Sequence, residues 1–423
     1  MLRLIESPSE MEAPRLTLDE LAREGARRIL VAALDAEVAT YIEAHQDARD
    51  ENGHALVVRN GKARERKVTM GSGTVEIRAP RVNDRRHVDG ERQRFTSQIL
   101  PPYMRRSPRV AEVLPALYLH GLSTGDFREA LPLLLGEESA AGLSPTNIAR
   151  MTNQWQEDYR AFKKRSLADR DYVYIWVDGI HVNVRLEEDR LCLLVVIGAR
   201  PDGTKELIAI EDGYRESTES WLFVLRDLKA RGMQAPVVAV GDGALGFWAA
   251  VREVWPETRE QRDWVHKLGN VLDKLPKRLR PKAKEALHEI MYADTREAAD
   301  DAMVAFTANY EAKYPKAVES LQRDEEQLLT FFDFPAEHWK HLRTSNVVES
   351  PFATVRLRQR VTKGPGSRNK GLTMAFKLLD MAQKRWRRLN GHHLLPLVRA
   401  GAVFVNGERV ERETNEQEER IAA

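Results

Sequence analysis

Cysteine is nearly absent from this chain of 423 residues, in which Cys192 is the only one. A single cysteine excludes a disulfide within the chain, and we take it to exclude a cysteine-based zinc site as well. Cys192 lies in the apolar run LCLLVVIGA, which predicts a small buried side chain. This scarcity of cysteine is typical of proteins from the reducing cytosol.

Long hydrophobic runs are also missing. No stretch approaches the roughly 18 to 20 apolar residues that cross a membrane, and the start, MLRLIESPSEMEAPRL, is too short and too acidic for a signal peptide. No internal repeat or low-complexity segment is evident. We therefore expect a soluble cytoplasmic protein with no membrane partner. It should divide into two or three domains, because single cores stop growing near ~250 to 300 residues.

The net charge of +2 hides a strong division of charge along the chain. Residues 1–53 hold twelve acidic residues against six arginines, a net charge of −6. Residues 55–110 and 340–390 carry net charges of +9 and +11. Two basic segments this one-sided favour a polyanion as the partner.

The first 53 residues have the alternating pattern of amphipathic helices. Little nearby chain can cover their apolar stripe, so the stripe either forms a dimer interface or packs against later helices. Its members are Leu18, Leu21, Ile29, Leu30, Leu34, Val38 and Ile42.

Residues 54–100 predict a small basic β-hairpin arm. Glycine-rich turns separate runs in which apolar residues alternate with polar ones, as in VTMGSGTVEI. This arm carries the candidate DNA-binding residues Arg64, Arg66, Lys67, Arg78 and Arg81.

Residues 101–168 predict helices, the last of which opens with Ser144 as its cap and Pro145 as its first residue. Short helices joined by GLSTGD and GEESAAGLSP resemble a DNA-binding helix-turn-helix unit, although many ordinary helical pairs have the same pattern.

Over residues 169–266 the sequence pattern changes from that of helices to one dominated by strands. The pattern predicts three antiparallel strands, a helix, a strand, a helix and a short strand. This order resembles an RNase H-like core, an α/β fold with a mixed sheet and helices on both faces, and other mixed α/β folds share parts of it.

Two strands of this predicted sheet end on an aspartate followed by glycine. Asp178 ends the first strand and Asp242 ends the fourth, 64 residues later. Asp178 and Gly179 alone would fit a tight hairpin turn equally well. In an RNase H-like sheet the two strands are neighbours, and facing carboxylates repel unless a cation lies between them. We therefore expect Mg²⁺ or Mn²⁺, as a pair of ions, at this end of the sheet.

A third carboxylate, Glu349, follows Asp242 by 107 residues. Locally it fits a capping box with Asn346, or a position ahead of a helix that starts at Ser350 and Pro351. The surrounding charge favours a metal ligand beside a phosphate-binding surface. Its basic neighbours are Arg343, Arg356, Arg358, Arg360 and Lys363.

Five phrases together resemble the bacterial insertion-sequence transposases of the Mutator type, which are DDE enzymes. They are VDGIHV, ESWLFVLRDLKARG, VGDGALGFWAAVREVWPETREQRDWVHKLGNVLDKLPK, RTSNVVESPFATVRLRQRVTKGPGSRNKGLTMAFKLLDMAQKRWRRLNG and, more loosely, RNGKARERKVTMGSGTVEIRAPR. The resemblance implies a catalytic, metal-binding triad of Asp178, Asp242 and Glu349. It also implies a helical insertion over residues 267–340, a last part of the core over 341–392 and a tail over 393–423.

The family motif Cys/Asp-x-x-His corresponds here to Asp263 and His266. These residues are candidate catalytic groups that orient the scissile phosphate or DNA, or else an ordinary surface aspartate and a histidine near a helix cap. Between them, Trp264 either stacks on an unpaired base or packs in the core.

The resemblance implies metal-dependent DNA cleavage at terminal inverted repeats, followed by strand transfer into target DNA. The partners would be double-stranded DNA and a second copy in a homodimer, with no small-molecule substrate. The protein would associate with the bacterial nucleoid when bound to DNA. Alternatives are a catalytically silent DNA-binding regulator derived from a transposase and a simple RNase H-like nuclease.

Overall fold

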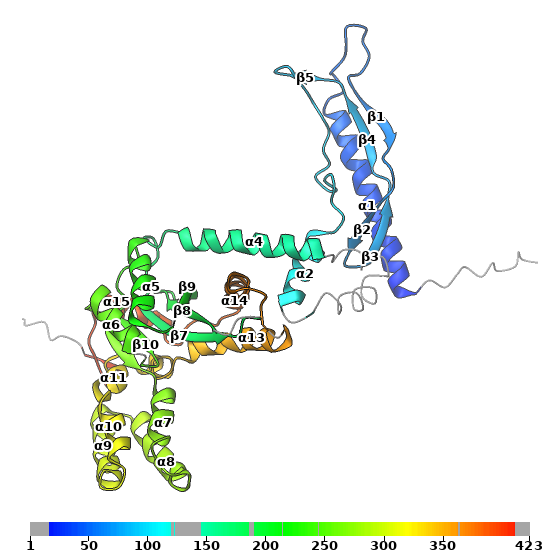
Figure 1. The fold of residues 1–423 in the computed structure, drawn as a ribbon. Helices are drawn as coiled ribbons and strands as arrows, with labels where there is room; N and C mark the ends of the chain where they lie inside the picture. Colours follow the sequence, from blue (N-terminus) through cyan, green and yellow to red (C-terminus); the bar gives the residue numbers. More distant parts are fainter. Residues whose placement is uncertain are drawn as a thin grey trace, which may run out of the picture. The chain divides into compact units, whose positions relative to one another are not determined.

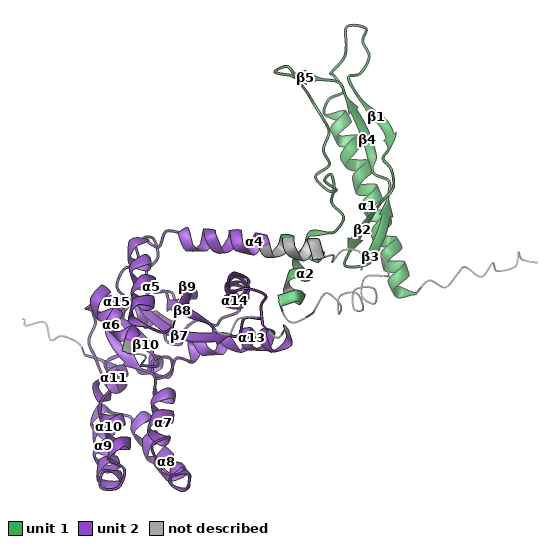
Figure 2. Ribbon diagram, in the orientation of Figure 1, with its two compact units in different colours: residues 1–151 green, residues 152–423 purple. Residues whose placement is uncertain are grey.

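The computed structural model describes residues 17–119, 122, 145–185, 190–213, 215–243, 245–362 and 364–410. The chain forms two compact units, Met1–Met151 and Thr152–Ala423 (Figure 2). The boundary falls within helix α4 (Pro145–Lys164), which starts at the proline predicted to begin it. Of the predicted helix-turn-helix, only α2 (Pro108–Leu119) and α4 are described, and Ser144 with most of the connection lies outside the described residues.

The first unit combines one long helix with short antiparallel strand pairs. Helix α1 (Leu18–Glu43) starts at a capping box, in which Thr17 and Glu20 satisfy each other's backbone amides. The strands pair as β1 (Val57–Lys62) with β4 (Pro80–Asp84), β2 (Arg66–Met70) with β3 (Gly73–Ile77), and β5 (His87–Val88) with β6 (Glu91–Arg92). The predicted basic hairpin is the β2–β3 pair.

One small core joins α1 to the strands, so the helical segment and the arm belong to one unit. Leu34 packs with residues of β2 and β3, and Val38 is also buried. Of the two alternatives for the apolar stripe of α1, the structure supports internal packing for its central residues, against strands rather than against later helices. Leu18, Leu21 and Ile29 remain exposed.

The second unit is built on a five-stranded mixed sheet in the order β11-β10-β7-β8-β9 (Figure 1). Strands β7 (Tyr174–Val182), β8 (Leu191–Ala199) and β9 (Lys205–Gly213) are antiparallel, and β10 (Val238–Gly241) and β11 (Arg259–Arg262) run parallel to β7. Helix α5 (Thr218–Ala230) connects β9 to β10, and α6 (Leu245–Val254) connects β10 to β11. The elements follow one another as the sequence predicted.

The two faces of the sheet pack against different helices. On one face Val177 and Cys192 join a core with Trp221 of α5 and Phe247 of α6. On the other face the Trp176 indole donates to the carbonyl of His341 over 2.7 Å. Helices α13 (Asn346–Thr362) and α14 (Arg368–Gln383) also contact the strands. Because side chains alternate along a strand, Asp178 lies on the face of Trp176, and Gly179 and His181 lie on the face of Val177.

Between β11 and α13 the chain is helical, as predicted. Residues 263–345 are all described and contain no strand. Successive contacts join α7 (Trp264–Leu272), α8 (Arg280–Met291), α9 (Arg296–Tyr310) and α10 (Pro315–Gln322), and α10 returns to α7. Figure 1 shows these helices projecting from the sheet. The short helices α11 (Glu325–Leu329) and α12 (Trp339–Leu342) lead back to it.

Residues predicted as a C-terminal tail are folded as far as Val410. They form α15 (Leu395–Arg399) and a hairpin of β12 (Phe404–Val405) and β13 (Glu408–Arg409). Arg399 pairs with Asp171, and the Gly407 amide donates to the carbonyl of Phe332. Within the described chain, no helix is both long and apolar enough to cross a membrane.

Candidate active site

The two predicted aspartates lie at the same end of adjacent parallel strands. The last paired residues of β7 and β10 are Trp176 and Val240, and Asp178 and Asp242 each lie two residues further on. After this point β7 continues beside β8 alone. Asp178 is therefore not the first residue of a hairpin turn, because strand β7 runs through it to Val182.

A glycine is required immediately after Asp242. Gly243 has φ +85°, and the guanidinium of Arg262 occupies the place that a side chain at this position would take. The tight turn lets the chain leave β10 directly after the carboxylate and enter α6.

Several carboxylates act electrostatically on Asp178. Burial raises the pKa of Asp178 to about 7, although the Gly179 amide donates to this carboxylate over 2.7 Å and opposes the shift. The negative charges of Asp242, Glu216 and Glu349 raise that pKa further. The three predicted acids therefore influence one another electrostatically, together with Glu216, although among the described residues they do not form a group whose carboxylate oxygens all lie within 4.8 Å of one another.

The fourth acid, Glu216, escaped the sequence prediction. It precedes α5 in the loop after β9, where no strand end or helix periodicity marks it. Its carboxylate lies over Gly179, in the space that a side chain there would fill. Burial raises the pKa of Glu216, and the charge of Asp242 raises it further. Only tertiary packing brings the charge of this residue close enough to act on Asp178.

Glu349 lies in the first turn of α13. The amide of Glu349 already donates to the carbonyl of Ser345 over 3.1 Å, and Pro351 is inside the helix. The alternative in which the helix starts at Ser350 is therefore wrong. The Ser345 hydroxyl donates to Glu349 Oε1, and this atom lies 3.7 Å from His266 Nδ1.

Asp263 is hydrogen-bonded to both His266 and Ser345, the two residues next to Glu349. Its carboxylate is fully buried and caps α7 by accepting from the His266 amide over 2.6 Å. It also accepts from the Ser345 amide, and the Ser345 hydroxyl, whose one proton is donated to Glu349, lies 2.9 Å from the same Asp263 oxygen. Burial raises the pKa of Asp263, but the hydrogen bonds from His266 and Ser345 outweigh this effect and lower it. Its buried position and these hydrogen bonds are those expected of a residue that positions His266 and Ser345.

His266 is a cation among these acids. A hydrogen bond from its Nδ1 to Asp263 over 3.2 Å raises the pKa of His266 to about 9, against the effect of burial. The charges of Asp263, Glu349 and Asp242 contribute in the same direction. The imidazolium is half-exposed, so it can reach an anionic group placed beside Glu349.

Two of the predicted DNA contacts, Trp264 and Arg358, are buried, which corrects the prediction for them, whereas Arg343 is partly exposed. Trp264 is fully buried, and its indole donates to the carbonyl of Leu328 over 2.8 Å. The Arg343 guanidinium packs against the rings of Phe331 and Trp339. Arg358 is buried, although it lies between exposed arginines on the same helix.

Other predicted contacts remain exposed. On α13 these are Arg356 and Arg360, and Lys363 lies outside the described residues. In the first unit Arg66 is half-buried and donates to the carbonyls of Leu100 and Pro101. Its exposed neighbours on the arm are Arg64, Lys67, Arg78 and Arg81.

Sequence comparison identifies the class of protein. Residues 5–380 match the family described as "Transposase, Mutator family". The chain therefore belongs to the Mutator family of transposases.

Its relatives are transposases of bacterial insertion sequences. The chain is 60% identical to the transposase for insertion sequence element IS6120 of Mycolicibacterium smegmatis, over 72% of this chain and 94% of the relative. It is 48% identical to that for IST2 of Acidithiobacillus ferrooxidans, over 66% of this chain and 95% of the relative. It is 28% identical to that for IS905 of Lactococcus lactis, over 80% of this chain and 83% of the relative.

Proposed function

We propose that this transposase is a DDE enzyme with an RNase H-like core, in which Asp178, Asp242 and Glu349 form the catalytic triad. Three antiparallel strands followed by two parallel ones on the other side of β7 support the core assignment. The single observation that carries the proposal is that Asp178 and Asp242 follow the last paired residues of two adjacent parallel strands, and the charge of Glu349 on α13 also acts on Asp178.

The acids fit a hard divalent cation. Their donors are carboxylate oxygens, the ligand type that Mg²⁺ and Mn²⁺ prefer. Burial is the main cause of the raised pKa of Asp178, and the charges of the neighbouring acids add to it; a divalent ion bound beside Asp178 would offset those charges. When bound, a pair of ions would supply Lewis acidity to the scissile phosphate.

The surrounding residues have distinct roles in this proposal. Asp263 and Ser345 fix the rotamer of Glu349 through the hydrogen bonds between them. His266 places a positive charge where a DNA phosphate approaches the acids. Arg356 and Arg360 contact the DNA backbone further along α13.

The reaction is phosphodiester transfer in two steps at one site. Water attacks a phosphorus at the end of a terminal inverted repeat, the bond to the 3′ oxygen breaks, and the released 3′ oxygen takes up a proton. This 3′-OH then attacks a target phosphodiester in line, and the target 3′ oxygen leaves. A silent regulator would have no use for the convergent acids, so the enzyme is the better explanation.

We expect the first unit to recognise the terminal repeat. It has its own core and the basic arm, whereas Arg356 and Arg360 beside Glu349 are suited to holding backbone. A fragment of residues 1–151 should bind terminal-repeat duplex more tightly than random duplex at moderate salt, in a fluorescence anisotropy titration. Replacing Arg64 and Arg78 by alanine should weaken both affinities and reduce the salt dependence. Equal affinity of the unmodified fragment for the two duplexes would contradict this assignment.

We also propose a homodimer, because joining two transposon ends requires two active sites. Deleting α1 cannot test this, since Leu34 belongs to the core of the first unit. The exposed residues Leu18 and Leu21 remain candidates for the interface. Substituting both by glutamate should give a folded monomer by light scattering that binds one DNA end but cannot pair two. Persistence of the dimer would exclude this surface.

A further inference from the structure

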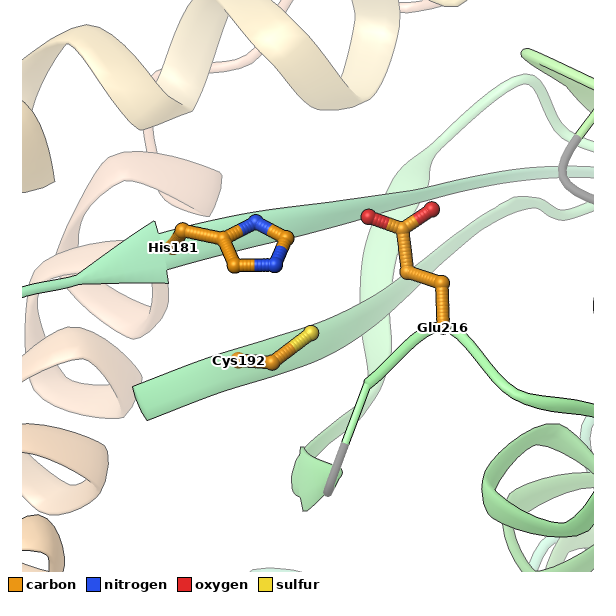
Figure 3. Close-up of side chains that lie close together, drawn as sticks. All are labelled: His181, Cys192 and Glu216. Atoms are coloured by element: carbon orange, nitrogen blue, oxygen red, sulfur yellow. The ribbon is translucent and has the colours of Figure 1, made fainter. Parts of the chain in front are cut away.

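Three different metal-binding side chains meet beside the catalytic acids, on the opposite face of β7. His181 on β7 and Cys192 on β8 are directly paired across the ladder, so their side chains lie on the same face. Glu216 reaches them from the loop before α5 (Figure 3). One donor atom from each residue lies within 4.8 Å of the other two.

The local structure keeps this space open. Gly179, two residues before His181 on the same face, has no side chain, and the Glu216 carboxylate occupies the vacant position. Cys192 is 1% exposed and forms the floor, while His181 is exposed and Glu216 half-buried. Figure 3 shows the imidazole, the sulfur and the carboxylate pointing toward one another. An ion can enter from the side of His181.

We propose that His181, Cys192 and Glu216 bind one divalent ion of the zinc class. A thiolate, an imidazole nitrogen and a carboxylate oxygen are the ligands that Zn²⁺ and Co²⁺ prefer, whereas a thiolate is a poor ligand for Mg²⁺. Three protein ligands leave the fourth tetrahedral position to water. Coordination by Cys192 releases the thiol proton to solvent.

This site differs from the proposed magnesium centre in chemistry and position. Asp178 projects from the other face of β7, toward α13, and the ligands there are oxygens. Glu216 couples the two sites electrostatically, because its charge interacts with those of Asp178 and Asp242. An ion held by Glu216 would remove a negative charge from beside the aspartates, so zinc occupancy would modulate the acid cluster.

The single cysteine makes the site directly observable. Any thiolate-to-metal charge-transfer band must come from Cys192, because the chain has no other thiol. We expect full-length protein titrated with Co²⁺, in excess Mg²⁺ and without thiol reductant, to develop a saturable near-ultraviolet band with a stoichiometry of one. Zn²⁺ should displace the bound Co²⁺ and so abolish the band. The measurement does not depend on the proposed reaction, because it needs no DNA and no turnover.

Matched variants define the ligands. Cys192→Ala should abolish the band, and His181→Asn and Glu216→Gln should each weaken Co²⁺ affinity by at least about tenfold. His87→Asn, at another exposed histidine in a strand, should leave the affinity unchanged. Circular dichroism checks that each variant folds. Absence of the band in the wild type, or an unchanged affinity in either His181→Asn or Glu216→Gln, would overturn the proposal.

Discussion

Asp242→Asn should lower the rate of cleavage of a terminal-repeat duplex by roughly 1000-fold, while DNA affinity falls by less than about threefold. A metal ligand contributes several kcal/mol of transition-state stabilisation, and each 1.36 kcal/mol corresponds to a factor of ten in rate. Affinity is retained because it depends mainly on phosphate contacts elsewhere. The amide is close in size to the carboxylate, so the turn at Gly243 is preserved.

The control is Asp212→Asn, at an exposed acid that pairs with Arg368 rather than with the convergent carboxylates. It should cleave at close to the wild-type rate. Undiminished cleavage by Asp242→Asn would remove Asp242 from the catalytic triad. A wild-type protein that binds the repeat but never cleaves it would favour the silent regulator.

Asp263→Asn should lower the free energy of unfolding of the second unit by about 2 to 5 kcal/mol, since a buried acceptor in a charged network is lost. The carboxylate accepts from the backbone amides of His266 and Ser345, and a side-chain NH₂ group in place of either oxygen would oppose one of these donors. Glu349 would also lose its fixed rotamer, so cleavage should fall as well. Urea unfolding monitored by tryptophan fluorescence measures the first effect.

The same substitution should change the response to acid. The pKa of Asp263 is lowered in the folded state, so its contribution to stability is present above the unfolded pKa of ~3.9 and disappears as the pH falls through the folded value. Below about pH 4 the stability of the wild type should therefore fall more steeply than that of Asp263→Asn. Asp301→Asn, at an exposed helix position, should follow the wild type. Parallel stability curves for wild type and Asp263→Asn would show that Asp263 is not held as its hydrogen bonds indicate.

The sequence predicts the order of elements well because the relevant signals are local. Alternation at Val173, Ile175 and Val177 identifies β7, and Pro145 marks the start of α4. The prediction from the sequence fails where the role of a residue depends on whether its side chain is buried. Trp264 and Arg358 have surface-like neighbours in sequence, yet helix packing buries both. The packing of the apolar stripe on α1 could not be predicted for the same reason, because its partners are strands that lie 30 or more residues later in the sequence.

In the candidate site, too, local sequence signals predict some residues and miss others. Asp178 and Asp242 are visible in the sequence because each follows an apolar strand and precedes a glycine. Glu349 is ambiguous locally, since a first-turn glutamate also fits a cap, and its proposed role rests on the resemblance to known transposases. Glu216 has no local signal at all. The pairing of His181 with Cys192 requires the register of β7 and β8, which the sequence pattern does not give. The zinc-class site proposed at these residues therefore departs from the exclusion of a cysteine-based zinc site that the cysteine count suggests.

The most direct test of the central claim is to locate bound Mn²⁺ by anomalous diffraction from crystals of the wild-type protein with terminal-repeat DNA. The account predicts anomalous density in contact with carboxylate oxygens of Asp178, Asp242 and Glu349, at distances of ~2.0 to 2.2 Å. Mn²⁺ bound at other residues, with these three carboxylates free of metal, would contradict it.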